Sequence, residues 1–271
     1  LGDIWAGGIG GKQMVKISGK TYDVILRISI ANLCPYGATT DSYGNIWVMS
    51  RKWYSYCHEG IVKIDTKKNQ VVGFYSASGG YGIAADRRGH VWASSYEHSR
   101  LYQFDAKAGT LLKTYPLGGR GRGVGVDSSG KIWVACSHNQ HNSGQEINRV
   151  ARVDPNNGQV SGFTHVGRHT IGLAIDAKGF IWAISYAEGK AYKLKESDGS
   201  RVAIYSTCDT SGSRPCANSG CKRCSSVGTA KPYNYSDMTG FQLQIVIEPA
   251  KATWRGVLDA KCHAHYSSFM W

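Results

Sequence analysis

Apolar residues recur along this chain in short runs that are separated by tight polar turns. Residues 82–95 (GIAADRRGHVWASS) contain an apolar run, an Asp-x-x-Gly turn and a second apolar run that carries a tryptophan. The same arrangement returns without gaps at residues 37–50, 123–136 and 172–185. Short apolar runs bounded by glycine and aspartate predict β-strands that are joined by tight turns.

The repeats return at a regular interval. A shortened copy, residues 2–8, opens the chain, and the repeat tryptophans then lie 41 to 49 residues apart, at Trp5, Trp47, Trp92, Trp133 and Trp182. A period in this range with several short strands per repeat is typical of a β-propeller. The sequence therefore predicts an all-β protein, a β-propeller of five recognisable four-stranded blades, the first of which lacks its first strand. A degenerate sixth blade stays open.

The repeat pattern stops near residue 206. Residues 1–206 are predicted to form the blades, and the polar, cysteine-dense residues 207–232 are predicted to form an insertion. In residues 233–271 we expect a strand that closes the ring of blades, because closure would remove the exposed sheet edge between the first and last blades. The alternative for residues 233–271 is the start of a β-sandwich extension.

The connections between predicted strands fall into two groups. The short ones carry aspartate and glycine, which suit tight turns, and we interpret these aspartates as turn residues and not as calcium ligands. The other loops are longer and more varied. In an up-and-down blade the two groups lie on opposite faces, so we expect function on the face with the varied loops, which we call the variable-loop face.

The net charge of the chain is +13 over 271 residues. This predicts attraction to anionic partners such as acidic glycans or anionic surfaces, although a basic surface without a specific partner is an equal alternative. The lysines and arginines are scattered and form no RNA-binding motif, so no specific nucleic acid partner is expected. No apolar run approaches the length of about 18 residues that a membrane-spanning segment needs, so no membrane span is expected.

The cysteine content indicates an oxidising compartment. Eight cysteines in an all-β chain favour disulfides and hence a secreted or cell-surface protein. Cys34 and Cys57 are predicted to pair, because both lie in loops of the variable-loop face. Four others cluster, and for these we favour disulfides over a zinc site, since their spacing matches no common zinc finger: Cys208, Cys216, Cys221 and Cys224. Cys136 ends an apolar run, and we expect a free thiol or a bond to a loop. No metal and no other cofactor is expected.

The pattern Gly-apolar-x-apolar-Asp-x-x-Gly-x-apolar-Trp resembles the propellers of the NHL, regucalcin-like gluconolactonase and virginiamycin B lyase group. The lyase resemblance would place a catalytic acid three residues after a repeat tryptophan, beside a histidine from a neighbouring loop. At that position this chain has only non-acidic residues, Gly8, Ser50, Ser95, Cys136 and Ser185. The gluconolactonase resemblance implies a metal held by Glu, Asn and Asp, and no matching acidic set is found on the inner strands. The resemblance therefore implies the fold and neither activity.

Histidines are the first candidates for chemistry. His138 and His141 lie in a long loop with Glu146 nearby, and His169 precedes the last repeat with His165. A histidine–carboxylate site could bind a metal or move a proton. The catalytic candidates are His138, His169 and Glu188, and the alternative is that the histidines are solvated loop residues.

Aromatic and arginine side chains are the second candidates. Flat rings beside the guanidinium groups of arginines such as Arg51 and Arg120 suit stacking on sugars together with pairing to acidic groups. The alternative is that these side chains pack to anchor loops. The candidate ligand-binding residues follow or precede the repeats on the variable-loop face: Trp53, Tyr96, Arg122, Arg168 and Tyr186.

These observations together favour a secreted or cell-surface binding or assembly module that contacts an anionic glycan or a protein partner through its variable-loop face. One alternative is a lyase- or lactonase-like propeller enzyme with a relocated His/Glu site, so the sequence leaves catalysis open and favours binding. Another is a structural subunit of an extracellular filament or sheath that self-associates through its C-terminal tail.

Overall fold

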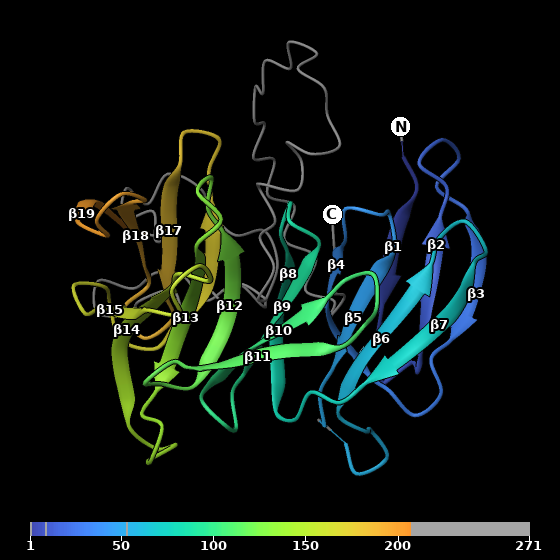
Figure 1. Ribbon diagram of the computed structural model, residues 1–271, viewed down its shortest axis with the longest axis horizontal. Helices are drawn as coiled ribbons and strands as arrows, with labels where there is room; N and C mark the ends of the chain where they lie inside the picture. The colour runs from blue at the N-terminus through green and yellow to red at the C-terminus, as the bar shows by residue number, and fades with distance from the viewer. Residues whose placement is uncertain (1, 9, 53, 207–271) are drawn as a thin grey trace, which may run out of the picture.

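The computed structural model describes residues 2–8, 10–52 and 54–206, which form five antiparallel β-sheets (Figure 1). One sheet has three strands and each of the other four has four strands. Within every sheet the strands follow chain order, so consecutive strands are hydrogen-bonded neighbours. The prediction of an all-β propeller with five recognisable blades is thereby confirmed.

We number the blades in chain order. Among the described residues, blade one has no first strand, as predicted, and contains β1 (Ile4–Gly7), β2 (Gln13–Ile17) and β3 (Val24–Ser29). Blade two contains β4 (Pro35–Thr40), β5 (Ile46–Ser50), β6 (Gly60–Asp65) and β7 (Gln70–Tyr75). Blade three contains β8 (Gly80–Ala85), β9 (His90–Ser95), β10 (Arg100–Asp105) and β11 (Leu111–Pro116). Blade four contains β12 (Gly121–Val126), β13 (Ile132–His138), β14 (Glu146–Val153) and β15 (Val160–Phe163). Blade five contains β16 (Thr170–Ile175), β17 (Phe180–Ser185), β18 (Lys190–Lys195) and β19 (Arg201–Ser206).

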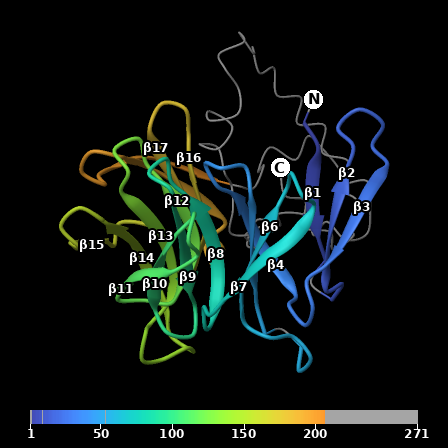
Figure 2. The same ribbon diagram turned by 45° about the vertical axis from the view of Figure 1, so that its right-hand side comes forward.

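The blades follow one another in space in the same order, from β1–β3 in blue to β16–β19 in orange (Figures 1 and 2). The strands β4, β8, β12 and β16 are the inner strands, because each contacts the inner strand of a neighbouring blade. The inner strand β8 is buried along its whole length, whereas the outer strand β7 alternates between exposed and half-buried residues. Inner strands are therefore apolar or glycine-rich, and outer strands carry the polar alternation.

The hydrophobic core of the described residues consists of four clusters, each between two consecutive blades. Between blades three and four, for example, Trp92 and Leu101 pack with Val134. Trp47 and Trp133 occupy the matching clusters on either side and are fully buried, as Trp92 is. A blade thus buries its apolar face only against its neighbours, which is why the fold requires the repeat.

Each repeat aspartate accepts hydrogen bonds both from N–H groups of its own turn and from the indole N–H of the tryptophan six residues later. In blade four, Asp127 Oδ1 accepts the backbone N–H groups of Ser129 at 3.0 Å and Lys131 at 2.8 Å. Its other oxygen, Oδ2, accepts the indole N–H of the buried Trp133 at 2.8 Å. The equivalent aspartates of the other repeats bind their tryptophans in the same way, with distances of 2.7 to 2.9 Å: Asp41, Asp86 and Asp176. These aspartates are turn residues, as predicted, and they also satisfy a buried donor.

The glycine that opens the repeat allows neighbouring inner strands to approach closely. A Cβ atom on Gly82 would lie 2.3 Å from the backbone oxygen of Arg122 on the next inner strand. That contact is too short for any side chain. Ser94 Oγ fills the remaining space and donates a hydrogen bond to the same oxygen.

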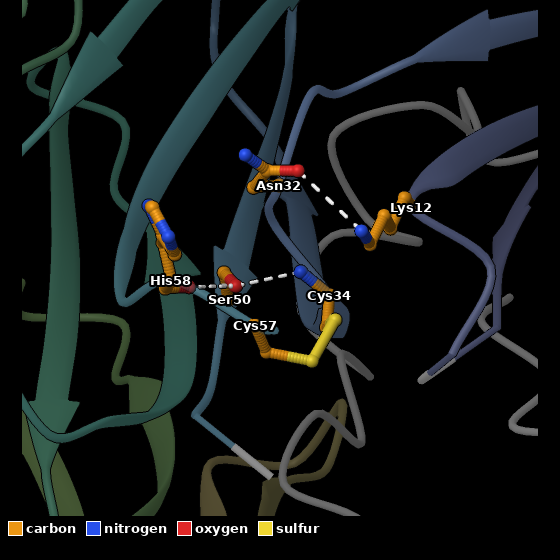
Figure 3. Close-up of a disulfide and its surroundings, with 6 residues drawn as sticks. All are labelled: Lys12, Asn32, Cys34, Ser50, Cys57 and His58. Atoms are coloured by element: carbon orange, nitrogen blue, oxygen red, sulfur yellow. Dashed lines mark hydrogen bonds between the residues drawn. A yellow bond between two sulfur atoms is a disulfide. The ribbon is translucent and has the colours of Figure 1, made fainter. Parts of the chain in front are cut away.

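Cys34 and Cys57 form a disulfide with a Cα–Cα distance of 5.5 Å, which confirms the predicted pair (Figure 3). Ser50 lies beside it, where its Oγ accepts the N–H of Cys34 at 2.8 Å and donates to the carbonyl oxygen of His58 at 2.6 Å (Figure 3). Cys136 is free and fully buried. Burial raises the pKa of its thiol to about 12, so the thiol stays protonated.

The predicted cysteine-rich insertion and the predicted ring-closing strand or β-sandwich extension, residues 207–271, lie outside the described residues, as do Cys208, Cys216, Cys221 and Cys224. Their arrangement and any role of the tail in self-association stay predictions. Within residues 2–206 as described, no helix is long and apolar enough to cross a membrane.

Candidate functional site

Six aromatic rings form a continuous row on the variable-loop face. Consecutive ring centroids in this row are 4.6 to 6.2 Å apart. The row begins in blade two and ends in blade five, so it crosses four blades. We call these residues the aromatic row: Tyr36, Tyr81, Tyr96, His138, His169 and Tyr186.

Two positions of the repeat supply four of the six residues of the aromatic row. The residue before the repeat glycine is Tyr36 in blade two, Tyr81 in blade three and Arg122 in blade four. The residue that follows the end of the repeat is Arg51, Tyr96, Ser137 or Tyr186 in blades two to five. Because every inner strand starts, and every second strand ends, on the same face, these two positions meet there in each blade.

Three guanidinium groups lie over the tyrosines of the row. The Arg51 guanidinium carbon is 4.7 Å from the Tyr81 ring centroid and 5.1 Å from that of Tyr96. The corresponding distances for Arg122 are 4.7 Å and 4.9 Å, and Arg120 lies 5.1 Å from the Tyr96 centroid. These distances are within the range of cation–π attraction. We call Arg51, Arg120 and Arg122 the arginine cluster.

Hydrogen bonds hold the arginine cluster in place. Arg122 is buried, and its Nε donates to Ser137 Oγ at 2.6 Å while its terminal nitrogen donates to the Tyr81 hydroxyl. The half-exposed carboxylate of Glu97 lies 3.1 Å from Arg120 and 3.8 Å from Arg51. One carboxylate therefore bridges two of the three guanidinium groups.

His138 ends β13 and is buried, so it is not a solvated loop residue. Its Nδ1 lies 2.9 Å from Ser137 Oγ and 3.4 Å from the Tyr96 hydroxyl. Burial is the main cause that lowers the pKa of His138 to about 4, and the nearby charges of His169 and Arg122 act in the same direction. The His138 imidazole is therefore neutral at neutral pH.

His169 and Glu146 form a hydrogen-bonded pair beside His138, in the half of the aromatic row that contains the histidines. His169 Nδ1 lies 2.7 Å from Glu146 Oε1, and this hydrogen bond is the main cause that holds the pKa of Glu146 below its usual range. Glu146 begins β14 directly opposite His138 in the β13–β14 register. His169 has a left-handed backbone with φ of 52°, and its N–H donates to the carbonyl oxygen of Ile147 at 2.9 Å. One nitrogen of each histidine and one carboxylate oxygen of Glu146 all lie within 4.8 Å of one another.

The structure brings together some of the predicted site residues and leaves others apart. Tyr96, Arg122, His138, His169 and Tyr186 lie along the aromatic row or against it. Trp53 lies outside the described residues. The sequence places Glu146 near His138 but indicated Glu188 as the candidate catalytic carboxylate, and the carboxylate that contacts His169 in the structure is that of Glu146.

Glu188 makes its hydrogen bonds within blade five and the loop that precedes it. Its carboxylate accepts the backbone N–H of Arg168 at 3.0 Å and the hydroxyl of Tyr192. The Arg168 guanidinium lies near enough to Glu146 to help lower the pKa of that carboxyl. The sequence places Arg51 and Arg120 among the arginines beside the aromatic residues of this face, although the ligand-binding candidates drawn from it include only Arg122 and Arg168 among the arginines. Arg51 occupies the repeat position that Tyr96 and Tyr186 also occupy.

The chain matches no protein-family model, and no curated protein matches it. Solved structures do resemble it. A protein of unknown function from Bacteroides caccae matches with a TM-score of 0.55 and 15% identity over 75% of this chain and 72% of that chain. A catalytically inactive virginiamycin B lyase from Staphylococcus aureus, solved with quinupristin, matches with a TM-score of 0.54 and 17% identity over 67% and 58%. The extracellular domain of a protein from Bacteroides thetaiotaomicron described as a one-component system matches with a TM-score of 0.59 and 16% identity over 76% and 30%.

The chain is a β-propeller. At 15–17% identity these likenesses show the fold alone, and the chain spans only 58% of the lyase chain and 30% of the extracellular domain. The positions where the lyase resemblance would place a catalytic acid are fully buried non-acidic residues in blades two to five: Ser50, Ser95, Cys136 and Ser185. The resemblance of the sequence to the NHL and gluconolactonase propellers is likewise limited to the fold.

Proposed function

We propose that this protein is a secreted or cell-surface β-propeller that binds an acidic glycan on its variable-loop face, through the arginine cluster and the aromatic row. The observation that carries the proposal is the convergence of Arg51, Arg120 and Arg122 over Tyr81 and Tyr96. Guanidinium groups pair with the carboxylates or sulfates of an acidic sugar, and flat rings stack on sugar faces.

The electrostatics of the face support an anionic ligand. Arg120 and Arg122 both contribute to lowering the pKa of His138, which shows that they produce a positive potential at that point. Glu97 already illustrates the fit, because its carboxylate lies between Arg51 and Arg120. A ligand carboxylate could take the same place if the Glu97 side chain, which is 49% exposed, turned outward. The net charge of +13 would add long-range attraction.

Two observations support a location outside the cytosol. The Cys34–Cys57 disulfide is of a kind that persists in oxidising compartments. One structural neighbour is an extracellular domain. A refolded or secreted preparation with this disulfide intact is therefore the form to test.

Calorimetric titration with carboxylated and sulfated oligosaccharides tests the proposal. Arg120→Gln should weaken binding about tenfold or more, because a hydrogen bond to a charged group contributes about 1.5–3 kcal/mol. Arg88→Gln is the matched control, since it removes the same charge from the turn between β8 and β9 on the opposite face. Equal weakening by both variants, or equal binding of neutral oligosaccharides, would contradict the proposal. Binding of acidic peptides in place of glycans would redirect it to a protein partner.

A second candidate function is that of a lyase- or lactonase-like enzyme. It is favoured by the His169–Glu146 pair beside His138, because a histidine hydrogen-bonded to a carboxylate can move a proton. Turnover of a lactone or a uronate oligosaccharide that His138→Gln abolishes would support it. Binding of such compounds without turnover would contradict it.

A further inference from the structure

We propose that His138, Glu146 and His169 bind one divalent metal ion of the zinc class. The three side chains already place two imidazole nitrogens and one carboxylate oxygen within 4.8 Å of one another. This inference does not depend on the proposed glycan binding, because it concerns other side chains and another ligand.

The backbone positions of the three residues are tied together. His138 and Glu146 are direct partners across the β13–β14 ladder. His169 comes from the loop before β16 of the next blade, and its N–H donates to Ile147, the residue after Glu146, at 2.9 Å. In the other direction, the carbonyl oxygen of His169 accepts the N–H of Tyr186 at 3.1 Å. Ligands carried by strand ends and hydrogen-bonded loops need only small side-chain movements to close on an ion.

The donor set determines the class of metal. Two imidazoles and one carboxylate form the protein half of zinc sites that keep a position open for water or another ligand. Calcium and magnesium require six or more oxygen ligands, and a set with two nitrogens and one carboxylate does not suit them. Among first-row ions, imidazole ligands suit zinc, copper, iron and nickel, and Zn²⁺ and its spectroscopic substitute Co²⁺ are the probes that need no control of oxidation state.

The residues around the histidines prepare them for this role. Ser137 Oγ lies 2.9 Å from His138 Nδ1, and it can accept a hydrogen bond from that nitrogen while it also accepts from Arg122 Nε. This tautomer leaves Nε2 of His138 with its lone pair available, as in metal sites whose histidines donate their other N–H to a neighbouring group. At the second histidine, the metal would replace the proton that His169 Nδ1 and Glu146 Oε1 now share at 2.7 Å.

The arginines near the three side chains also favour one kind of ligand at the open position of the metal. The metal with one carboxylate would carry a net charge of about +1. Arg120 and Arg122 lie close enough to act on His138, so they oppose the bare cation and favour an anion at the open position. A small anion such as acetate or phosphate is therefore expected to tighten metal binding rather than compete with it.

Titration of the full chain with Co²⁺, followed by visible absorption, tests this inference. One Co²⁺ per chain should bind with d–d bands of a nitrogen–oxygen site, and Zn²⁺ should displace it. Glu146→Gln and His169→Gln should each weaken Co²⁺ binding by ~100-fold or more, since even outer partners of metal ligands contribute 10–100-fold. His141→Gln is the matched control, because it alters an exposed histidine in the β13–β14 connection and should leave the affinity unchanged.

The clustered cysteines beyond residue 206 provide the outcome that would overturn the proposal. A thiolate site would show intense near-ultraviolet charge-transfer absorption that persists in Glu146→Gln and His169→Gln proteins. That result, or no Co²⁺ binding by the parent protein, refutes the His–Glu site. Circular dichroism and thermal unfolding of the two variants show whether they keep the fold. If His169→Gln does not fold, Glu146→Gln alone decides, because it preserves the size of the side chain and its hydrogen bonding to His169.

Discussion

His138 should make the stability of this protein depend on pH between about 4 and 6.5. The pKa of His138 is about 4 in the folded protein, against 6.5 for histidine in an unfolded chain. The unfolded chain therefore binds the proton more tightly, and lowering the pH favours unfolding. The stabilisation is fully present above pH 6.5 and is lost as the pH falls towards 4.

The size of the effect follows from the shift. One pKa unit corresponds to about 1.4 kcal/mol, so the free energy of unfolding should fall by about 2.5 kcal/mol between pH 7.5 and pH 4.5 because of this group alone. Glu146 acts in a lower range, since its pKa is below its usual range and its contribution is lost only as the carboxyl takes up a proton. The interval from pH 6.5 to 4.5 thus reports mainly on His138.

Urea unfolding at four pH values between 7.5 and 4.5 measures the effect. His138→Gln should flatten the dependence by about 2.5 kcal/mol, whereas His141→Gln, which removes an exposed histidine, should retain the slope of the parent. A parent slope that survives in His138→Gln would refute the reasoning. If that variant does not fold, an NMR titration of the His138 ring in the parent decides, and a midpoint near 6.5 would refute the buried, neutral state.

Three further predictions concern other parts of the molecule. Asp127→Ala should lower the free energy of unfolding by about 3 kcal/mol, because it leaves the buried indole N–H of Trp133 without its acceptor. Asp65→Ala should cost much less, since its partly exposed carboxylate binds the turn N–H groups of the exposed residues Lys67 and Lys68 and the ammonium of Lys68, which water can solvate. Equal losses in urea unfolding would contradict this account. Glu97→Gln should raise the affinity for acidic oligosaccharides severalfold in calorimetry, because it removes a carboxylate that competes for two guanidinium groups, and unchanged affinity would count against the arginine cluster as the binding site. Replacing Cys34 and Cys57 by serine together should lower the unfolding free energy by about 3 kcal/mol, given the separation of 23 residues that the bond closes, and a loss below about 1 kcal/mol would show that the loop gains little from it.

The repeat itself predicts a large part of the variable-loop face. Once the strands are assigned, the residue before each repeat glycine and the residue after each repeat end must reach the same face. Tyr81 and Tyr96 could therefore be placed near one another from sequence, because both positions recur in every blade. The burial of these two side chains could not be predicted from the sequence, since it depends on how closely blades two, three and four pack around the arginines.

The histidine–carboxylate cluster shows where this reasoning stops. His138 and Glu146 meet because the β13–β14 ladder shifts register between Cys136 and His138 and then extends by one further pair. His169 joins them through a left-handed backbone in a loop of the next blade. None of these features belongs to the repeat, so the periodic pattern of the sequence does not predict them. The sequence placed Glu146 near His138 along the chain but named Glu188 as the candidate catalytic carboxylate, and Glu188 binds Tyr192 within blade five.

The sequence by itself determined the all-β propeller, the five blades, the missing first strand, the aspartate turns and the pairing of Cys34 with Cys57. These features are local or periodic, since each blade repeats one pattern of apolar strands and glycine turns. In such a repeat, equivalent sequence positions occupy equivalent places in every blade. The tertiary structure alone decided which charges face one another. Arg51, Arg120 and Arg122 converge, and His138 is buried beside His169, because consecutive blades pack through their inner strands and exclude water there. Distance, burial and electrostatic field at that face depend on several blades at once, and no single stretch of sequence contains them.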